Sequence, residues 1–171
     1  MVQVDLITGF LGAGKTTLGR ILAKRLGISF VDTDERIVRE QKRAVSDIFA
    51  KEGESYFREL ETEQLKELLG LEERMVISVG GGLPVQPQNH ELLRELGTTI
   101  YLKAGIETLV KRLSRDTKRP LLQGGSVEEK IAGLMREREP VYEKVADKIV
   151  QTDGKSVDEA VDMLQQECEQ L

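Results

Sequence analysis

One segment near the amino end constrains this chain more than any other. Residues 9–16 read Gly-Phe-Leu-Gly-Ala-Gly-Lys-Thr, a full match to the phosphate-loop pattern G-x-x-x-x-G-K-[ST]. A predicted strand at 2–8 precedes the segment, and a predicted helix at 15–26 follows it. The glycines let backbone N–H groups curl around phosphate oxygens, and the helix N-terminus attracts their charge. The segment therefore predicts a nucleoside triphosphate site, with Lys15 at the terminal phosphates and the Thr16 hydroxyl on Mg²⁺.

Short apolar runs alternate with helical patterns along the rest of the chain. Strands are predicted at 2–8, 28–31, 75–79, 98–102 and 148–152. Helices are predicted at 15–26, at 46–69 with an interruption near Gly53, and at 89–96, 106–114, 127–142 and 156–170. Pro140 predicts a break or kink near the end of the helix at 127–142. This alternation predicts an α/β layer fold with a mostly parallel sheet, in which ligands lie beyond the carboxyl ends of the strands.

Length and composition exclude several classes of protein. The 171 residues fit one domain over 1–171, at roughly 150 residues per domain. No apolar run approaches the roughly 20 residues of a membrane span, and the amino end lacks the basic stretch of a signal peptide, so a cytoplasmic protein is expected. Lys and Arg number 25 against 30 Asp and Glu, a net charge of −5, which argues against a generic nucleic-acid binder. An anion site must therefore concentrate its cations locally.

Two carboxylates close the second predicted strand, in the sequence Val31-Asp32-Thr33-Asp34. Alternate residues of an extended chain point to the same face, so both side chains could project from one strand end beside the phosphate loop. One carboxylate could then hold Mg²⁺ or its waters while the other accepts the proton of an attacking hydroxyl. The alternative is that Asp32 or Asp34 only caps a following helix.

Three charged side chains are predicted to face inward. Arg58 and Glu61 fall inside the apolar arc of the helix at 46–69 and are three residues apart, so they can touch. A buried charged pair is costly unless it is satisfied or meets a ligand, although a surface ion pair is the alternative. Arg138 lies within the apolar stripe of the helix at 127–142. The two guanidiniums suit bidentate recognition of a carboxylate or phosphate.

Two further segments carry candidate ligand contacts. Residues 80–82 are three glycines after a predicted strand, which indicates either a backbone closely approached by a ligand or a plain tight turn. The stretch 111–119 holds five basic residues, Lys111, Arg112, Arg115, Lys118 and Arg119, with Asp116 as its one acid. Pro120 and paired glycines follow. Such a loop can close over phosphates and exclude water, so a lid over about 114–126 is expected rather than a solvated surface alone.

Together these motifs resemble the shikimate kinase family over nearly the whole chain. They occur in the family's order: the phosphate loop at 9–16, Asp32-x-Asp34, Phe57-Arg58-x-x-Glu61, Gly80-Gly81-Gly82, Arg119-Pro120-Leu121-Leu122 and Arg138-x-Pro140-x-Tyr142. Apart from the phosphate loop each motif is weak alone, but the combination is highly specific. The resemblance implies a three-layer P-loop kinase of the nucleoside monophosphate kinase type, with five parallel strands ordered 2-3-1-4-5.

The implied activity is transfer of a phosphoryl group from ATP, with Mg²⁺, to the 3-hydroxyl of shikimate. The products would be shikimate 3-phosphate and ADP, in the pathway to chorismate and the aromatic amino acids. The shikimate-binding region would span about 33–62. Shikimate and ATP are the expected partners, nucleic acid and membrane are not, and a monomer is expected.

The resemblance also implies roles on the acceptor side. Asp34 would bind ring hydroxyls of shikimate and orient or deprotonate the attacking 3-hydroxyl. Arg58 and Arg138 would grip the carboxylate, and Glu61 would hold Arg58 and approach the substrate through water. The Gly81–Gly82 backbone would donate to a ring hydroxyl.

On the nucleotide side, the resemblance implies that Lys15 and Arg119 stabilise the transferring γ-phosphoryl and that Arg112 packs against adenine. Asp32 and Thr16 would serve Mg²⁺. The other implied contacts of the nucleotide are Gly12, Ala13, Gly14, Thr17 and Lys155. The sequence departs from the family at 151–157, because Lys155 stands where arginine is common and a following proline is absent. Lysine stacks less well than a guanidinium, which puts the tightness of adenine packing in question.

Three other functions compete. A nucleoside monophosphate kinase has an ionised phosphate as acceptor, which Asp34 would repel. A gluconate kinase accepts a hydroxyl and binds a carboxylate, so only the combined motifs argue against it. A catalytically silent nucleotide-binding relative would be expected to lack one of Lys15, Asp34, Arg58 or Arg119, and all four are present.

Overall fold

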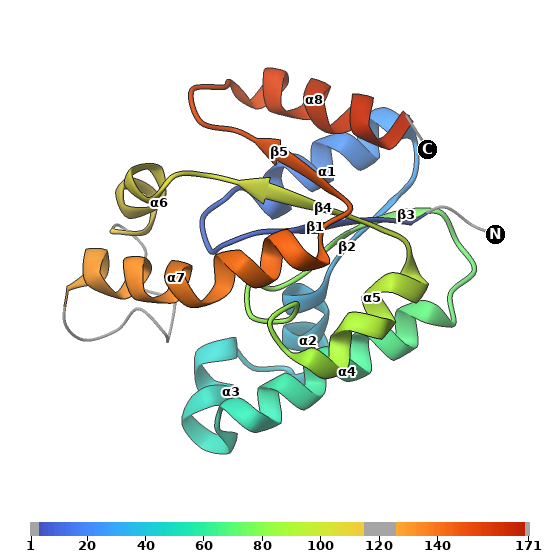
Figure 1. Ribbon diagram of the computed structural model, residues 1–171. Helices are drawn as coiled ribbons and strands as arrows, with labels where there is room; N and C mark the ends of the chain where they lie inside the picture. The colour runs from blue at the N-terminus through green and yellow to red at the C-terminus, as the bar shows by residue number, and fades with distance from the viewer. Residues whose placement is uncertain (1–3, 115–125, 170–171) are drawn as a thin grey trace.

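The computed structural model describes residues 4–114 and 126–169 (Figure 1). Its parallel sheet consists of β1 (Val4–Thr8), β2 (Ser29–Asp32), β3 (Met75–Ser78), β4 (Thr98–Lys103) and β5 (Lys148–Gln151). The strand order is β2-β3-β1-β4-β5, as the resemblance implied, and every neighbouring pair is parallel. The central place of β1 brings the phosphate loop that follows it to the middle of the carboxyl edge of the sheet.

Helices connect the strands and cover the sheet. They are α1 (Lys15–Leu26), α2 (Thr33–Gln41), α3 (Val45–Glu52), α4 (Glu54–Leu69), the short 3₁₀ helix η1 (Pro87–Asn89), α5 (His90–Leu96), α6 (Ile106–Leu113), α7 (Val127–Val145) and α8 (Val157–Glu169). The predicted interruption near Gly53 separates α3 from α4. In the described ranges, no helix combines the length and the apolar character that crossing a bilayer requires.

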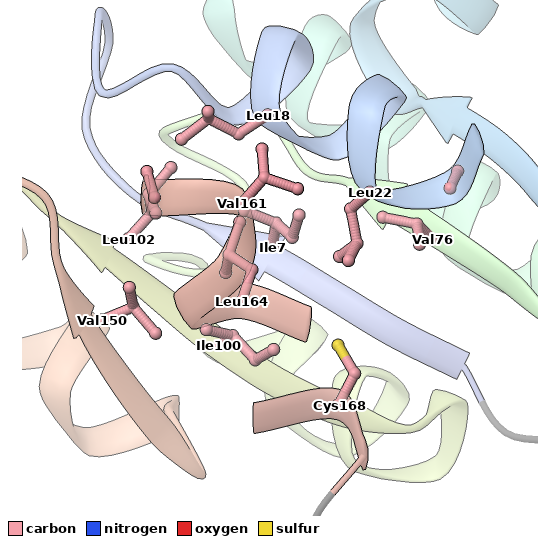
Figure 2. Packing of buried hydrophobic residues seen from close by; sticks show 12 residues of the cluster. Ile7, Leu18, Leu22, Val76, Ile100, Leu102, Val150, Val161, Leu164 and Cys168 are labelled. Atoms are coloured by element: carbon pink, nitrogen blue, oxygen red, sulfur yellow. The ribbon is translucent and has the colours of Figure 1, made fainter. Parts of the chain in front are cut away.

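Two apolar layers enclose the sheet, because alternate residues of a strand face opposite ways. On one face, Ile7 and the facing residues of β3, β4 and β5 pack against α1 and α8 (Figure 2). On the other face, Leu6 and its neighbours pack against α4 and α5. A third cluster joins α6 and α7 to Tyr101 of β4 and to Phe10 of the phosphate loop. The loop is thus anchored to the same core as the helices around it.

The structure corrects two expectations about helices. Residues 33–41 form α2, which entered the sequence analysis only through the alternative that Asp32 or Asp34 caps a following helix. Its buried residues are Thr33 and Ile37, so only one large apolar side chain of α2 is fully buried. Helix α7 continues through Pro140 to Val145, so the predicted end at 142 and the break offered as one effect of Pro140 are wrong. Proline removes one backbone hydrogen bond, but α7 buries Ile131 before it and Tyr142 after it, so packing on both sides sustains the helix.

Candidate active site

A cavity of about 570 Å³ opens at the carboxyl edge of the sheet, above β1, β2 and β3. The phosphate loop and the start of α1 form its floor. Among its lining residues are all the described positions predicted to bind nucleotide or metal: Gly12, Ala13, Gly14, Lys15, Thr16, Thr17, Asp32, Arg112 and Lys155. Asp34 also lines it. The volume falls in the range of small-molecule and cofactor sites.

The phosphate loop has the geometry of an anion cradle. Gly14 is the N-cap of α1 at φ 95°, in the left-handed region that a glycine adopts without strain. The N-terminal N–H groups of α1 therefore face the cavity. In this structure the Lys15 ammonium donates to the carbonyls of Gly9 at 2.9 Å and Phe10 at 3.0 Å. Its positive charge is thus held at the loop, beside the space where phosphates would lie.

Thr16 and Asp32 lie together at the edge of this cavity. The Thr16 hydroxyl donates to Asp32 Oδ2 at 2.6 Å, while Asp32 Oδ1 accepts from the backbone N–H of Glu35 at 3.0 Å. Asp32 therefore caps α2 with one oxygen and contacts the phosphate-loop threonine with the other. The capping that was offered as the alternative and the predicted position beside the phosphate loop are both observed for Asp32. The Thr16 hydroxyl oxygen and Asp32 Oδ2 are hard oxygen ligands of the kind that Mg²⁺ prefers.

The opposite wall of the cavity comes from α6 and the loop between β5 and α8. Arg112 Nη1 donates to the carbonyl of Gly12 at 2.8 Å, which places its guanidinium at the rim. Lys155 is exposed on the facing loop. Asp153 links the two elements, because its carboxylate accepts from the N–H of Gly105 at 2.9 and 3.1 Å and from the Thr108 hydroxyl at 2.9 Å.

A second pocket of about 50 Å³ adjoins the first. Its charged lining comes from Asp34, Arg58, Glu61 and Arg138, and its apolar lining from Leu11, Val45, Phe49 and Phe57. The residues common to both pockets are Leu11, Asp34, Gly80 and Gly81. The structure thus places Asp34 at the boundary between a nucleotide-sized cavity and a small pocket with two guanidiniums.

Arg58 and Glu61 form a buried ion pair on α4. Arg58 Nη1 lies 2.6 Å from Glu61 Oε1, and the two residues are 8% and 0% exposed. Arg58 Nη2 also lies 3.0 Å from the half-exposed Glu54. Burial raises the pKa of Glu61 to about 7; Arg58 opposes this rise, and the carboxylate of Asp34 adds to it. The prediction that this pair faces inward is confirmed, and so is the inward position of Arg138, at 6% exposed.

The three glycines after β3 are packed against these charged groups. A Cβ on Gly80 would lie 2.8 Å from both Asp34 Oδ1 and Glu61 Oε2. A Cβ on Gly82 would overlap the guanidinium of Arg58, and one on Gly81 would lie 3.3 Å from Arg138 Nη1. These side chains converge on the glycine turn from three different helices. The absence of a side chain at these three positions therefore lets the protein's own charged groups approach the backbone closely.

A family model described as shikimate kinase matches residues 11–169. The chain belongs to the shikimate kinase family. A shikimate kinase of Chlorobium chlorochromatii is 44% identical over 171 residues, which cover 95% of this chain and 89% of that protein.

Solved structures agree. The shikimate kinase from Acinetobacter baumannii in complex with shikimate has a TM-score of 0.92 at 37% identity, covering 99% of this chain and 95% of that one. A deoxyadenosine kinase from M. mycoides has a TM-score of 0.63 at 19% identity, covers 99% of this chain and 100% of that one, and shares the fold alone. The fold is therefore that of a P-loop kinase.

Within this shikimate kinase family site, the expected position of Asp34 was wrong. Asp34 was expected to share an extended strand end with Asp32, but β2 ends at Asp32 and Asp34 lies in the first turn of α2. The two carboxylates nonetheless line the same cavity. Arg119 and most of the predicted lid at 114–126 lie outside the described residues.

Sequence reasoning missed one residue of this site. Thr33 is fully buried between the two aspartates, and its hydroxyl accepts the backbone N–H of Gly80 at 3.1 Å. No sequence signal marked it, because a threonine at a strand end is common. Tyr142 was noted only as part of a motif, yet its hydroxyl donates to the carbonyl of Gly81.

Proposed function

We propose that this chain phosphorylates the 3-hydroxyl of shikimate with ATP, releasing shikimate 3-phosphate and ADP. The observation that carries the proposal is the position of Asp34 where the two pockets meet. A carboxylic acid held by Arg58 and Arg138 would present its ring hydroxyls to Asp34. The Asp34 carboxylate also lines the larger cavity, in which the phosphate loop would hold the γ-phosphate. Membership of the shikimate kinase family supports shikimate as that acid.

The reaction is an in-line phosphoryl transfer. The oxygen of the 3-hydroxyl forms a bond to the γ-phosphorus, while the bond from that phosphorus to the bridging oxygen of ADP breaks. Asp34 orients the hydroxyl and accepts its proton. Lys15 leaves the loop carbonyls and pairs with the phosphates, where its charge stabilises the transferring group. We assign Arg119 the same role from its family motif.

Mg²⁺ fits the oxygens of Thr16 and Asp32. The described residues hold no cluster of three or more His, Cys, Asp or Glu able to bind a metal, so phosphate oxygens and water would complete its coordination. When bound, the ion supplies charge neutralisation on the β- and γ-phosphates. Gly12, Ala13, Gly14 and Thr17 would contact the nucleotide phosphates, and Arg112 and Lys155 would flank the base.

On the acceptor side, Arg58 and Arg138 grip the carboxylate and Glu61 keeps Arg58 in place. The Gly81–Gly82 backbone binds a ring hydroxyl. The proposal also includes action as a single-domain monomer in the cytoplasm. Size-exclusion chromatography with light scattering tests whether the chain is a monomer.

The deciding experiment is a coupled ADP-release assay with shikimate, gluconate and nucleoside monophosphates as acceptors. Turnover with shikimate alone is expected, whereas turnover with gluconate and none with shikimate would overturn the assignment. Asp34→Asn should lower kcat by roughly 10²- to 10⁴-fold, the usual contribution of a general base. ATP binding measured by calorimetry should change little, and comparable losses in both quantities would contradict the role of Asp34.

A further inference from the structure

The backbone polar groups of the glycine turn are held from two helices. Thr33 at the start of α2 accepts the N–H of Gly80, and the carbonyl of Gly80 accepts the N–H of Leu83 at 3.1 Å. The carbonyl of Gly81 accepts from the Tyr142 hydroxyl on α7. Among the described residues, no backbone acceptor is paired with the N–H of Gly81 or Gly82. The turn is thus fixed while these two donors stay available.

The hydroxyl of Tyr142 is enclosed at this contact, with Arg138 as a further hydrogen-bonding neighbour. The side chain is fully buried, and its ring packs against Tyr101 with centroids 5.3 Å apart. Burial raises the pKa of Tyr142 to about 12, with Arg138 opposing the rise, so the hydroxyl stays protonated and is a donor at neutral pH. Arg138 lies one turn earlier on the same helix, and its Nη1 approaches the same glycine.

The peptide plane links this contact to the pocket. The carbonyl of Gly81 and the N–H of Gly82 belong to one trans peptide, so they point in opposite directions. A donor that holds the carbonyl toward α7 therefore fixes the direction of the Gly82 N–H. Donation to the carbonyl also polarises the peptide and makes that N–H a stronger donor. Gly82 lines the pocket of Arg58 and Arg138.

We propose that Tyr142 is a positioning residue for the acceptor substrate: its hydroxyl holds the Gly81 carbonyl so that the Gly82 N–H binds a ring hydroxyl of shikimate. This inference rests on the proposed function. It gives α7 two tasks at one site, since Arg138 grips the carboxylate while Tyr142 orients the amide that recognises a hydroxyl. The spacing of four residues sets the distance between the two contacts.

The test compares Tyr142→Phe with Tyr101→Phe. Both substitutions remove only a buried hydroxyl from neighbouring rings, but the Tyr101 hydroxyl has no hydrogen-bond partner among the described residues. Tyr142→Phe should raise KM for shikimate about three- to tenfold, the worth of one hydrogen bond, with kcat and KM for ATP within about twofold. Tyr101→Phe should leave all three constants unchanged. Equal effects of the two variants, or equal changes in both KM values, would overturn the proposal.

Substrate analogues separate positioning from a general packing defect. The ratio of wild-type to Tyr142→Phe kcat/KM should fall to about one for either 4-deoxyshikimate or 5-deoxyshikimate, whichever lacks the hydroxyl that Gly82 binds. It should persist for the other analogue. A ratio that stays the same for shikimate and both analogues would refute the role. Absence of wild-type turnover on shikimate would instead sink the proposed function, so the two failures are distinguishable.

A measurement on the unmodified protein covers the case in which Tyr142→Phe folds poorly. In protein labelled with ¹⁵N-glycine, addition of shikimate without nucleotide should shift the Gly82 amide proton downfield, as expected for a new hydrogen bond. Gly133 of α7, which has open space around it, serves as the internal reference. An unchanged Gly82 resonance at saturating shikimate would contradict the proposal.

Discussion

Glu61 illustrates how far a single side chain is determined by its surroundings. Its carboxylate is fully buried beside the guanidinium of Arg58, and it lies with the carboxylate of Asp34 against Gly80. Ionised Glu61 is favoured by Arg58 and opposed by burial and by Asp34. Burial has a larger effect than Arg58, so the pKa of Glu61 rises to about 7. The residue therefore titrates near neutral pH while the protein remains folded.

This shift makes stability depend on pH. Because the folded pKa lies above the ordinary value of 4.5, the folded state keeps the proton that the unfolded chain releases. The contribution of Glu61 is therefore fully present below about pH 4.5 and is lost as pH rises through about 7, by about 3 kcal/mol. The glutamine in Glu61→Gln does not titrate. The free energy of unfolding measured in urea should therefore rise for the variant relative to wild type as pH rises from 5 to 8. Parallel curves for the two proteins would contradict the pKa of Glu61.

At the scale of elements, the loop between β5 and α8 caps the start of α6 from outside the helix, because the N-cap residue Gly105 has no side chain of its own. Asp153 supplies the acceptors for Gly105 and Thr108, and the same loop carries Lys155 into the nucleotide cavity opposite Arg112 of α6. The cap thus ties together the two walls predicted to flank the base. Hydrogen bonds from Gly105 in particular hold the pKa of Asp153 below its usual range.

Removing the cap should loosen both walls. Asp153→Ala is expected to cost about 1 kcal/mol of stability, as for other lost caps, and to raise KM for ATP several-fold while KM for shikimate is unchanged. Asp153→Asn keeps one acceptor oxygen and should give intermediate effects. Because the folded pKa is lowered, the stabilisation is present above about pH 4 and fades as pH falls through the folded value. A rise in KM for shikimate equal to that for ATP would argue against this linkage.

The elements that sequence reasoning predicted well are those with a strong local signal. Helix α1 was predicted with its bounds because the phosphate loop precedes it and Gly27 ends it at φ 68°. The inward positions of Arg58 and Arg138 followed from helical periodicity alone. Helix α2 was considered only as the capping alternative, and α7 was predicted to break or kink at Pro140 and to end at 142, because tertiary packing sustains both helices and local sequence does not record it. The contacts of Thr33 and Tyr142 with the glycine turn join segments 47 and 61 residues apart, so no spacing could predict them.

At the scale of the molecule, the net charge of −5 conceals a concentrated positive site. Lys15, Arg112 and Lys155 line the larger cavity, and Arg58 and Arg138 line the smaller pocket. Their charges face one cleft at the carboxyl edge of the sheet, while most acidic side chains lie on exposed helix faces. Two anionic ligands should therefore bind side by side, each stabilising the fold through its own set of cations.

Thermal unfolding can separate these two sets. At 100 times its dissociation constant, each ligand should add about 2.7 kcal/mol, and hence roughly 5–10 °C in Tm for a chain of this size. Lys15→Gln should abolish the shift with Mg-ATP and keep the shift with shikimate, whereas Arg138→Gln should do the reverse. The controls Lys24→Gln on α1 and Arg136→Gln on α7 alter exposed residues of the same helices and should keep both shifts. If either Lys15→Gln or Arg138→Gln abolished both shifts, the two pockets would not be separate subsites, and the division of the cleft at Asp34 would be wrong.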